Sequence, residues 1–346
     1  MLLLCSSISC RRVSDFAQLD SLVQSWLSKG YYEGAALCII QGDSILFQNS
    51  YGSYNADTKV YVASAGKWVA AAVIAVVVDQ TPLDWEDEVE RWLPSYRGDP
   101  KGKIRLRQLL SHTSGVLPYL PAPRVDQYNS LDSAVAEILP LDTVFRAGTR
   151  FQYGGLGMQI AGRMAEVAMG MTFEEIFQQE LASPLGMRAS HFVPIDTSGG
   201  HAPMLGGGLC TTLNDYIHFL NMMHHQGVFE GRRILRAETI RQMQADQIGD
   251  AHVDSGEYVE RGLGLRHRGV YGLGLWREKI DEETGEAYQF SSPGWAGAYP
   301  WLNTREGVYG FFIAHVKGGA NKADGFSSFY GSPILSETTS KILKSK

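Results

Sequence analysis

Apolar residues recur along the first eighty positions with two different periods. Over residues 14–27 they fall three or four positions apart, which predicts an amphipathic helix that ends at Gly30. Two apolar runs follow, at 35–40 and 45–51, and the short polar turn between them predicts a β-hairpin. Residues 65–79 are apolar almost all round, which is typical of a helix that is buried on every side.

The middle and the end of the chain show other patterns. Residues 85–191 predict short helices and proline-rich loops, and residues 214–225 predict another amphipathic helix. Strand-like runs return in the last third, and a closing helix is predicted after them: 271–276, 287–291, 298–302, 308–315 and then 332–346. Strands come from both ends of the chain, so we expect an α+β fold with an antiparallel sheet flanked by helices and an inserted helical domain.

This pattern predicts a division into domains. We expect residues 13–84 and 204–346 to form the sheet domain and residues 85–203 to form a mainly helical domain. The opening residues 1–12 contain Cys5 and Cys10, and two interpretations of them stay open. They are a flexible terminus, which leaves a cytoplasmic location open, or the remnant of a lipoprotein-type signal, which favours a periplasmic or lipid-anchored protein.

Charge and apolar length exclude some classes of partner. The chain has 346 residues and a formal net charge of −6 without a basic cluster, so we expect no nucleic-acid partner. The longest apolar candidate, residues 68–78, is shorter than a membrane helix requires, so no integral membrane span is predicted. The pattern predicts neither a metal nor a cofactor, and it leaves the oligomeric state open.

One tetrad at the start of the apolar helix has the composition of a catalytic site. Ser64-Ala65-Gly66-Lys67 is an S-x-x-K sequence, in which the first and last side chains share one helix face. A buried lysine loses part of its preference for the charged form and can then take a proton from a nearby hydroxyl. The alternative is a serine that caps the helix, with a lysine that reaches solvent from the first turn. The tetrad alone does not decide between them.

Further motifs in the same order favour the catalytic interpretation. Together they resemble the sequence pattern of the serine β-lactamase and penicillin-binding-protein superfamily, in particular the class C β-lactamases and the family VIII carboxylesterases. The matching segments are Pro82-Leu83-Asp84 to Trp92-Leu93-Pro94, Ser111-His112-Thr113-Ser114-Gly115, Phe151-Gln152-Tyr153-Gly154-Gly155, and Gly206-Gly207-Gly208-Leu209-Cys210-Thr211-Thr212 with Asp215.

The resemblance implies a β-lactamase/transpeptidase-like fold and a set of roles. Ser64 is the expected acylated nucleophile, and Lys67 and Tyr153 are expected to activate it. Whether Lys67 or Tyr153 is the base stays open, because a phenol acts as a base only where its phenolate is stabilised. His112 is expected to be structural.

The sequence departs from the superfamily pattern at two places. Gly155 stands where the pattern has an asparagine, and no K-T-G follows. Instead, Trp295-Ala296-Gly297 resembles a W-x-G variant of the last motif, so the backbone N–H groups of Ser64 and Ala298 are the expected oxyanion donors. If Ser292-Pro293-Gly294 is the aligned triplet, Trp295 supplies the second N–H group. The expected substrate-binding residues are Trp295, Gly297 and Gly155.

These expectations favour a serine acyl hydrolase, and a carboxylesterase for short acyl esters in particular. The expected partner is a small ester, amide or lactam. The alternatives are a β-lactamase, a D,D- or D-amino-acid peptidase, and a non-catalytic binding module on the same scaffold. An α/β-hydrolase is disfavoured, because the chain lacks a G-x-S-x-G elbow.

Overall fold

The computed structural model describes most of the chain. The described residues are 16–120, 130–192, 202–253, 258, 263 and 268–345. The opening segment with Cys5 and Cys10 lies outside them, so the two interpretations of that segment stay predictions.

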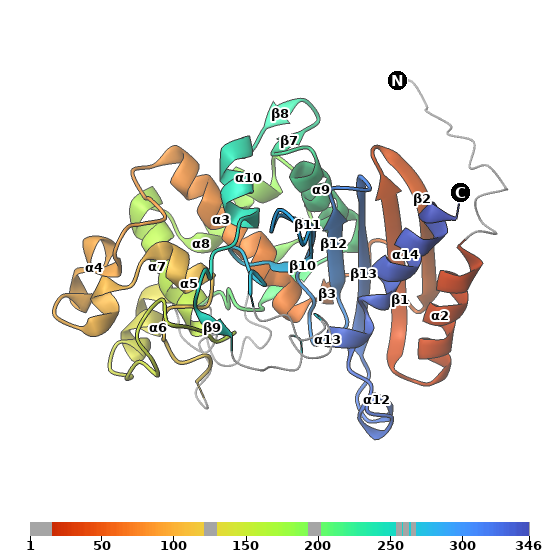
Figure 1. Cartoon of the computed structure of the whole chain (residues 1–346), viewed down its shortest axis with the longest axis horizontal. Coiled ribbons are helices and arrows are strands. Elements are labelled where there is room, and N and C mark those ends of the chain that lie inside the picture. The colour runs from red at the N-terminus through yellow and green to blue at the C-terminus, as the bar shows by residue number, and fades with distance from the viewer. Residues whose placement is uncertain are drawn as a thin grey trace.

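The main sheet joins the two ends of the described chain (Figure 1). Its strand order is β10-β11-β12-β13-β1-β2, and all neighbouring pairs are antiparallel. The strands are β1 (Tyr32–Gln41), β2 (Ser44–Gly52), β10 (Trp276–Ile280), β11 (Ala287–Ser291), β12 (Tyr299–Asn303) and β13 (Val308–Val316). The early hairpin therefore pairs with the last strand of the chain, and the predicted α+β fold is confirmed.

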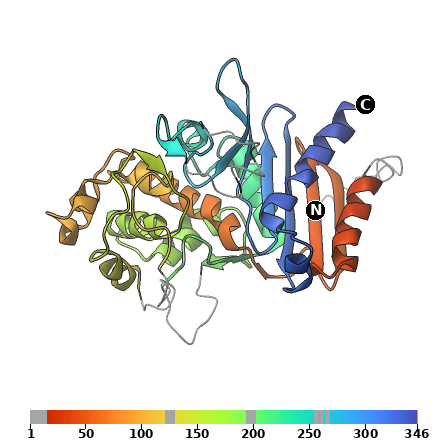
Figure 2. The ribbon, with the colours of Figure 1, turned by 60° about the horizontal axis from the view of Figure 1, so that its bottom comes forward.

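Side chains of β1 alternate between two hydrophobic clusters on the two faces of the sheet. Leu37 and Ile39 pack on the outer face with the helices α2 (Ala17–Ser28) and α14 (Ile334–Lys344). Ala36 and Cys38 face the larger cluster on the inner side, where α9 (Leu213–His224) lies against β13. Figure 2 shows the two terminal helices on one side of the sheet and the rest of the molecule on the other.

The helix α3 (Gly66–Gln80) lies in the centre of the molecule (Figure 1). With the preceding 3-10 turn η1 (Ala63–Ala65) it forms an apolar stretch of 18 residues, which is long and apolar enough to cross a membrane. The expectation that no stretch reaches this length was therefore wrong. However, 89% of the stretch is buried inside the protein, which identifies α3 as a core helix packed against α7 (Leu156–Met169) and the η5 segment (Phe177–Ala182).

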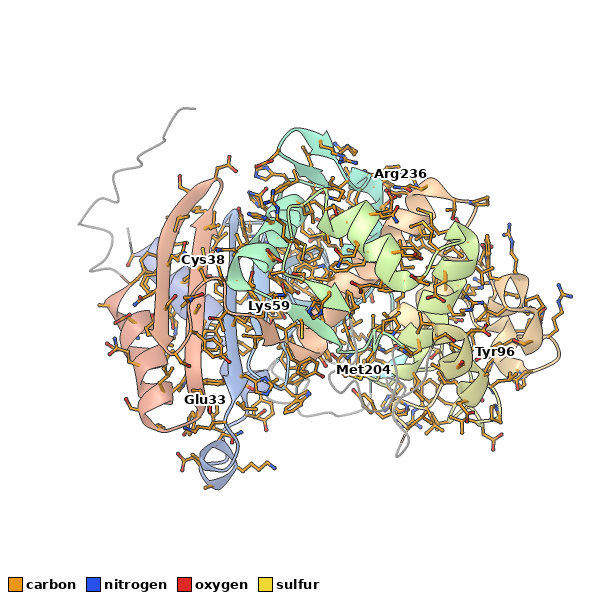
Figure 3. All side chains as sticks on the ribbon, turned by 180° about the vertical axis from the view of Figure 1, so that it is seen from behind. Glu33, Cys38, Lys59, Tyr96, Met204 and Arg236 are labelled. Carbon is orange, nitrogen blue, oxygen red and sulfur yellow. The ribbon has the colours of Figure 1, made fainter. Side chains whose placement is uncertain are left out.

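Short helices gather on the far side of α3 from the sheet, and Tyr96 marks this region in Figure 3. They are α4 (Val89–Trp92), η2 (Pro94–Tyr96), η3 (Pro100–Lys103), α5 (Leu106–Leu110), α6 (Leu131–Ile138), α7 and α8 (Phe173–Ile176). The boundaries of the two domains stay predictions.

The remaining elements of the described chain are short. They are β3 (Val60–Tyr61), β4 (Arg150–Phe151), β5 (His191–Phe192), β6 (Leu209–Thr211), β7 (Val228–Phe229), β8 (Arg232–Arg233), α10 (Ala237–Gln244), β9 (His252–Val253), α12 (Ala320–Ala323) and α13 (Ser328–Gly331).

The strand expected at residues 271–276 was wrong, because β10 begins only at Trp276. The preceding residues bend instead and pack against α3. Gly274 has a φ of +75°, and a Cβ atom there would lie 2.8 Å from the carbonyl oxygen of Lys67. Only glycine allows this close approach. The bend therefore packs directly against the first turn of α3, and it leads into the aromatic residues beside Tyr153.

Candidate active site

Ser64 lies on the turn η1, immediately before α3. The preceding residue, Ala63, has a φ of +50°, a left-handed conformation that alanine seldom adopts. Such strain persists where the surrounding structure enforces it, and it is common in active sites. Ser64 is only 8% exposed, and it lines a cavity. The turn therefore presents a largely buried hydroxyl to a limited space.

Lys67 is fully buried and points back at Ser64. Its Nζ atom donates to Ser64 Oγ at 3.1 Å and to the backbone carbonyl of Gly206. The same atom lies 4.6 Å from the centre of the Tyr153 ring. These three partners are neutral, so burial lowers the pKa of Lys67 to about 7. A substantial fraction of the amine is then unprotonated at neutral pH.

Tyr153 lies beside this pair, within a cluster of aromatic rings. Its ring stacks on Trp276 at 5.2 Å, and its hydroxyl is buried without a hydrogen-bond partner among the described residues. Burial raises the pKa of Tyr153, the nearby Tyr119 raises it further, and Ser64 and Trp276 lower it by a smaller amount. The phenol therefore stays protonated at neutral pH.

His112 packs against the Tyr153 ring with its own ring centre 4.7 Å away. Its Nε2 atom is hydrogen-bonded to the hydroxyl of Tyr271 at 3.2 Å. Burial, and then the positive charge of Lys67, hold the pKa of His112 well below its usual value. The imidazole is therefore neutral, and its hydrogen bond joins it to the aromatic cluster.

Gly155 and Gly206 touch through their backbones at the place where the sequence lacks the expected asparagine. A Cβ atom on Gly206 would lie 2.8 Å from the Cα atom of Gly155, so a side chain there would push the two segments apart. Gly206 also supplies the carbonyl that Lys67 binds. The close glycine contact thus holds a backbone acceptor beside the amine, where the superfamily pattern implies an amide side chain.

The turn between β11 and β12 forms the other side of the site. Ser292 Oγ donates to the carbonyl of Ser64 at 2.9 Å. A Cβ atom on Gly294 would lie 2.2 Å from the carbonyl oxygen of Val62 and 3.4 Å from the amide nitrogen of Ala65. Residues 292–294 therefore pack directly against the turn that carries Ser64.

Two expected residues of this turn lie elsewhere. Ala298 is fully buried in the main core, and its carbonyl accepts a hydrogen bond from the Gly294 N–H group at 2.7 Å. The space beside Gly297 faces the carbonyl of Ala314 on β13, and Gly297 is not part of the cavity lining. The contacts therefore favour Ser292-Pro293-Gly294 as the aligned triplet. Under that alternative the expected second donor is the N–H group of Trp295 in place of that of Ala298, and Gly297 is not among the described residues that line the cavity.

A cavity of about 320 Å³ lies over Ser64. Figure 3 shows one of its lining residues, Met204, between the sheet and the helical region. Among the described residues that line the cavity, none carries a formal charge: Tyr61, Ala63, Ser64, Tyr119, Leu120, Gly155, Leu156, Gln159, Met204, Gly206, Gly207 and Trp295. Of the expected substrate-binding residues, Trp295 and Gly155 thus lie at the cavity.

Most of the apolar lining was missed by the sequence analysis. Tyr119 and Leu120 follow the His-Thr-Ser-Gly segment, and Met204 precedes the three glycines. Their short distance in sequence from these motifs was the feature that could have indicated a place at the cavity. In the part of the chain that the structure describes, no group of three or more histidine, cysteine, aspartate or glutamate side chains is arranged to hold a metal ion.

Comparisons with known proteins agree with this geometry. The family model described as Beta-lactamase matches residues 19–325. A crystal structure from Bacteroides dorei DSM 17855, of a protein described provisionally as a beta-lactamase, is 69% identical. It covers 95% of this chain and 99% of that chain, with a TM-score of 0.91.

Two more distant relatives are described as a beta-lactamase and as a carboxylesterase. A beta-lactamase of Pseudomonas fluorescens is 23% identical over 238 residues, which cover 61% of this chain and 65% of that protein. The crystal structure of a family VIII carboxylesterase has a TM-score of 0.70 at 19% identity and covers 88% of this chain and 93% of that chain. At this identity, the second likeness shows a shared fold.

Proposed function

The chain belongs to the beta-lactamase family of serine hydrolases, and we propose that it hydrolyses short, uncharged carboxylic esters through an acyl-enzyme on Ser64. The observation that carries the choice of esters is that the described residues lining the cavity over Ser64 are neutral and largely apolar. A β-lactam carries a carboxylate, and binding that group favours a cation in the site. In the aligned triplet, Ser292 stands where the superfamily's K-T-G motif has its lysine, and the next residue outside the triplet, Trp295, lines the cavity with an indole.

Lys67 is the proposed base for acylation. Its amine accepts the proton of Ser64 Oγ across the 3.1 Å hydrogen bond, and the oxygen attacks the ester carbonyl. Its pKa of about 7 makes the unprotonated amine available, whereas the raised pKa of Tyr153 disfavours a phenolate base. Of the two candidate bases that the sequence left open, the environment therefore favours Lys67 over Tyr153.

Tyr153 and Lys67 together serve the leaving group in this proposal. The tetrahedral intermediate collapses, the carbon–oxygen bond to the alcohol breaks, and the alkoxide takes the proton that Lys67 accepted. Tyr153 donates its hydroxyl hydrogen bond to this developing negative charge, for which its unpartnered, protonated phenol is suited. Water then gives a proton to Lys67 and attacks the acyl carbonyl, and Ser64 regains its proton.

The backbone N–H groups of Ser64 and Trp295 are the proposed oxyanion donors. Contacts of Ser292 and Gly294 with the nucleophile turn support this choice, because they fix the residue that follows Gly294 relative to Ser64. The backbone N–H group of residue 295 is present whichever side chain that residue carries, apart from proline. The loss of K-T-G therefore removes a cation without removing this donor.

Substrate preference is the direct test of this proposal. Short p-nitrophenyl esters and a chromogenic cephalosporin are compared on one preparation, with Ser64→Ala as the control. We expect ester turnover that Ser64→Ala abolishes, and little turnover of the cephalosporin. Efficient cephalosporin hydrolysis with negligible ester hydrolysis would favour a β-lactamase, and activity that persists in Ser64→Ala would exclude the acyl-enzyme.

A further inference from the structure

Two exposed aromatic side chains stand at the cavity over Ser64. Six large hydrophobic side chains are exposed in the part of the chain that the structure describes, and two of them, Tyr119 at 55% and Trp295 at 57%, line this one cavity. An exposed aromatic ring costs solvation free energy unless a ligand or partner covers it. Their occurrence at the same cavity points to an apolar ligand between or against them.

The two rings come from different parts of the fold. Trp295 belongs to the turn between β11 and β12 on the sheet side, and Tyr119 belongs to the loop after the His-Thr-Ser-Gly segment on the helical side. The cavity that both line contains Ser64, so a substrate held by Ser64 lies within reach of both rings.

The backbone beneath each ring is held by hydrogen bonds. The carbonyl of Trp295 accepts from Ser328 Oγ at 2.7 Å. On the helical side, the carbonyl of Pro118, the residue before Tyr119, accepts from the N–H groups of Gly155 and Leu156 at 2.8 and 3.3 Å. Both rings are thus carried by ordered chain, which lowers the entropy cost of stacking on a ligand.

The Tyr119 ring lies beside Gly155. A Cβ atom on Gly155 would lie 3.6 Å from Cε1 and 3.9 Å from Cδ1 of Tyr119, so the ring packs beside the position where the superfamily pattern has an asparagine. An aromatic face therefore occupies the neighbourhood of the missing amide. This replacement disfavours a ligand that needs an amide partner and favours a flat apolar one.

We propose that Tyr119 and Trp295 form an aromatic clamp that selects esters carrying an aryl ring. The inference rests on the proposed ester hydrolysis and adds the substrate class. A flat ring stacks on both side chains, whereas a saturated ring of similar size is thicker and lacks the π system.

Matched esters test the clamp on the full-length protein. Benzyl acetate is compared with cyclohexylmethyl acetate, and methyl phenylacetate with methyl cyclohexylacetate, so that the aryl group is examined on the alcohol side and on the acyl side. Within each pair the leaving alcohol is similar or identical. We expect kcat/KM to favour the aryl ester about fivefold or more in at least one pair, mainly through KM. Equal kcat/KM values within both pairs would overturn the clamp.

Variants of the two rings supply the control. Tyr119→Leu and Trp295→Leu should each lower the aryl preference about threefold or more, whereas Tyr119→Phe, which keeps the ring, should retain it. An unchanged preference in both leucine variants would also overturn the inference. Labelling of Ser64 by a fluorophosphonate on the same samples distinguishes failure of the clamp from failure of the proposed ester hydrolysis. If the protein is labelled but shows no aryl preference, only the clamp is rejected. If the wild-type protein is neither labelled nor active, the proposed function is rejected together with the clamp.

Discussion

The two sides of Ser64 contribute to the site by different means. On the α3 side, the chemistry depends on the side chains of Lys67 and Tyr153, and both match the superfamily pattern. On the side of the turn between β11 and β12, the sequence departs from that pattern, yet Ser292 and Gly294 still hold the turn against the nucleophile. Proton transfer requires particular side chains, whereas an N–H donor is present at every residue except proline.

In the proposed mechanism, the α3 side sets whether Ser64 reacts, and the turn sets where the oxyanion lies and which substrates are bound. Substitutions on the two sides should therefore give different kinetic signatures.

Lys67→Met should abolish the proton transfer and stabilise the fold. We expect kcat to fall by about 10³-fold or more, within the range for loss of a general base. The buried amine also destabilises the folded protein, because each unit by which its pKa is lowered costs about 1.4 kcal/mol.

The stability effect has a definite pH dependence. Folding lowers the pKa of Lys67 to about 7, so the penalty is full below pH 7 and shrinks as the pH rises toward the unfolded-state value. Thermal melting should therefore show Lys67→Met more stable than the wild type at pH 6, with a smaller difference at pH 9. A variant that is less stable than the wild type at pH 6 would contradict the assigned environment of Lys67.

Gly294→Ala should damage the turn side through the backbone. The added Cβ atom would lie 2.2 Å from the carbonyl oxygen of Val62, so the turn must move away from Ser64. Loss of one aligned oxyanion donor lowers kcat by about 10²-fold or more. Trp295→Ala keeps the N–H group, so it should raise KM more than it lowers kcat. Equal losses of kcat in the two variants would contradict a backbone donor at residue 295.

Trp295→Lys should change which substrates bind while leaving the proposed base in place. The new ammonium group would stand at the cavity that Trp295 lines, so it can pair with a carboxylate. A charge-assisted contact contributes about 1.5–3 kcal/mol, or roughly 10-fold or more in binding an anionic substrate. We expect a lower KM for a cephalosporin and a higher KM for benzyl acetate. Unchanged KM values for both would show that this position does not contact the substrate.

The pH profile of acylation distinguishes the two bases. With Lys67 as the base, kcat/KM should fall about tenfold for each pH unit below a pKa of about 7 and reach a plateau above it. With Tyr153 as the base, the rate would continue to rise well above pH 9, because the pKa of the phenol is raised. Stopped-flow measurement of p-nitrophenol release with a short ester separates these outcomes.

Local patterns in the sequence were sufficient to predict most of the regular structure. The hairpin of β1 and β2 and the buried helix α3 follow from runs of apolar residues with a clear period. The segment at 271–276 has a similar apolar content but bends, because Gly274 packs against α3. That contact joins residues some two hundred positions apart, and no local pattern reports it.

The candidate site shows the same limit. The spacing of Ser64 and Lys67 within one helical turn indicated their contact directly. The choice between Ala298 and Trp295 depended instead on which part of a turn packs against Val62, and the apolar lining by Tyr119 and Met204 depended on how separate loops meet. These are tertiary contacts, so the sequence left the choice of the second oxyanion donor open and did not reveal the apolar lining of the cavity.

Peptide mapping after covalent labelling shows whether Ser64 is the residue acylated by the substrate. The protein is treated with a fluorophosphonate, digested, and analysed by mass spectrometry alongside Lys67→Met. We expect a single adduct on Ser64 in the wild-type protein and much slower labelling of the variant, since the unprotonated Lys67 amine is proposed to activate the hydroxyl. An adduct on Ser111 or Ser114 in place of Ser64, or equally fast labelling of Lys67→Met, would contradict this expectation.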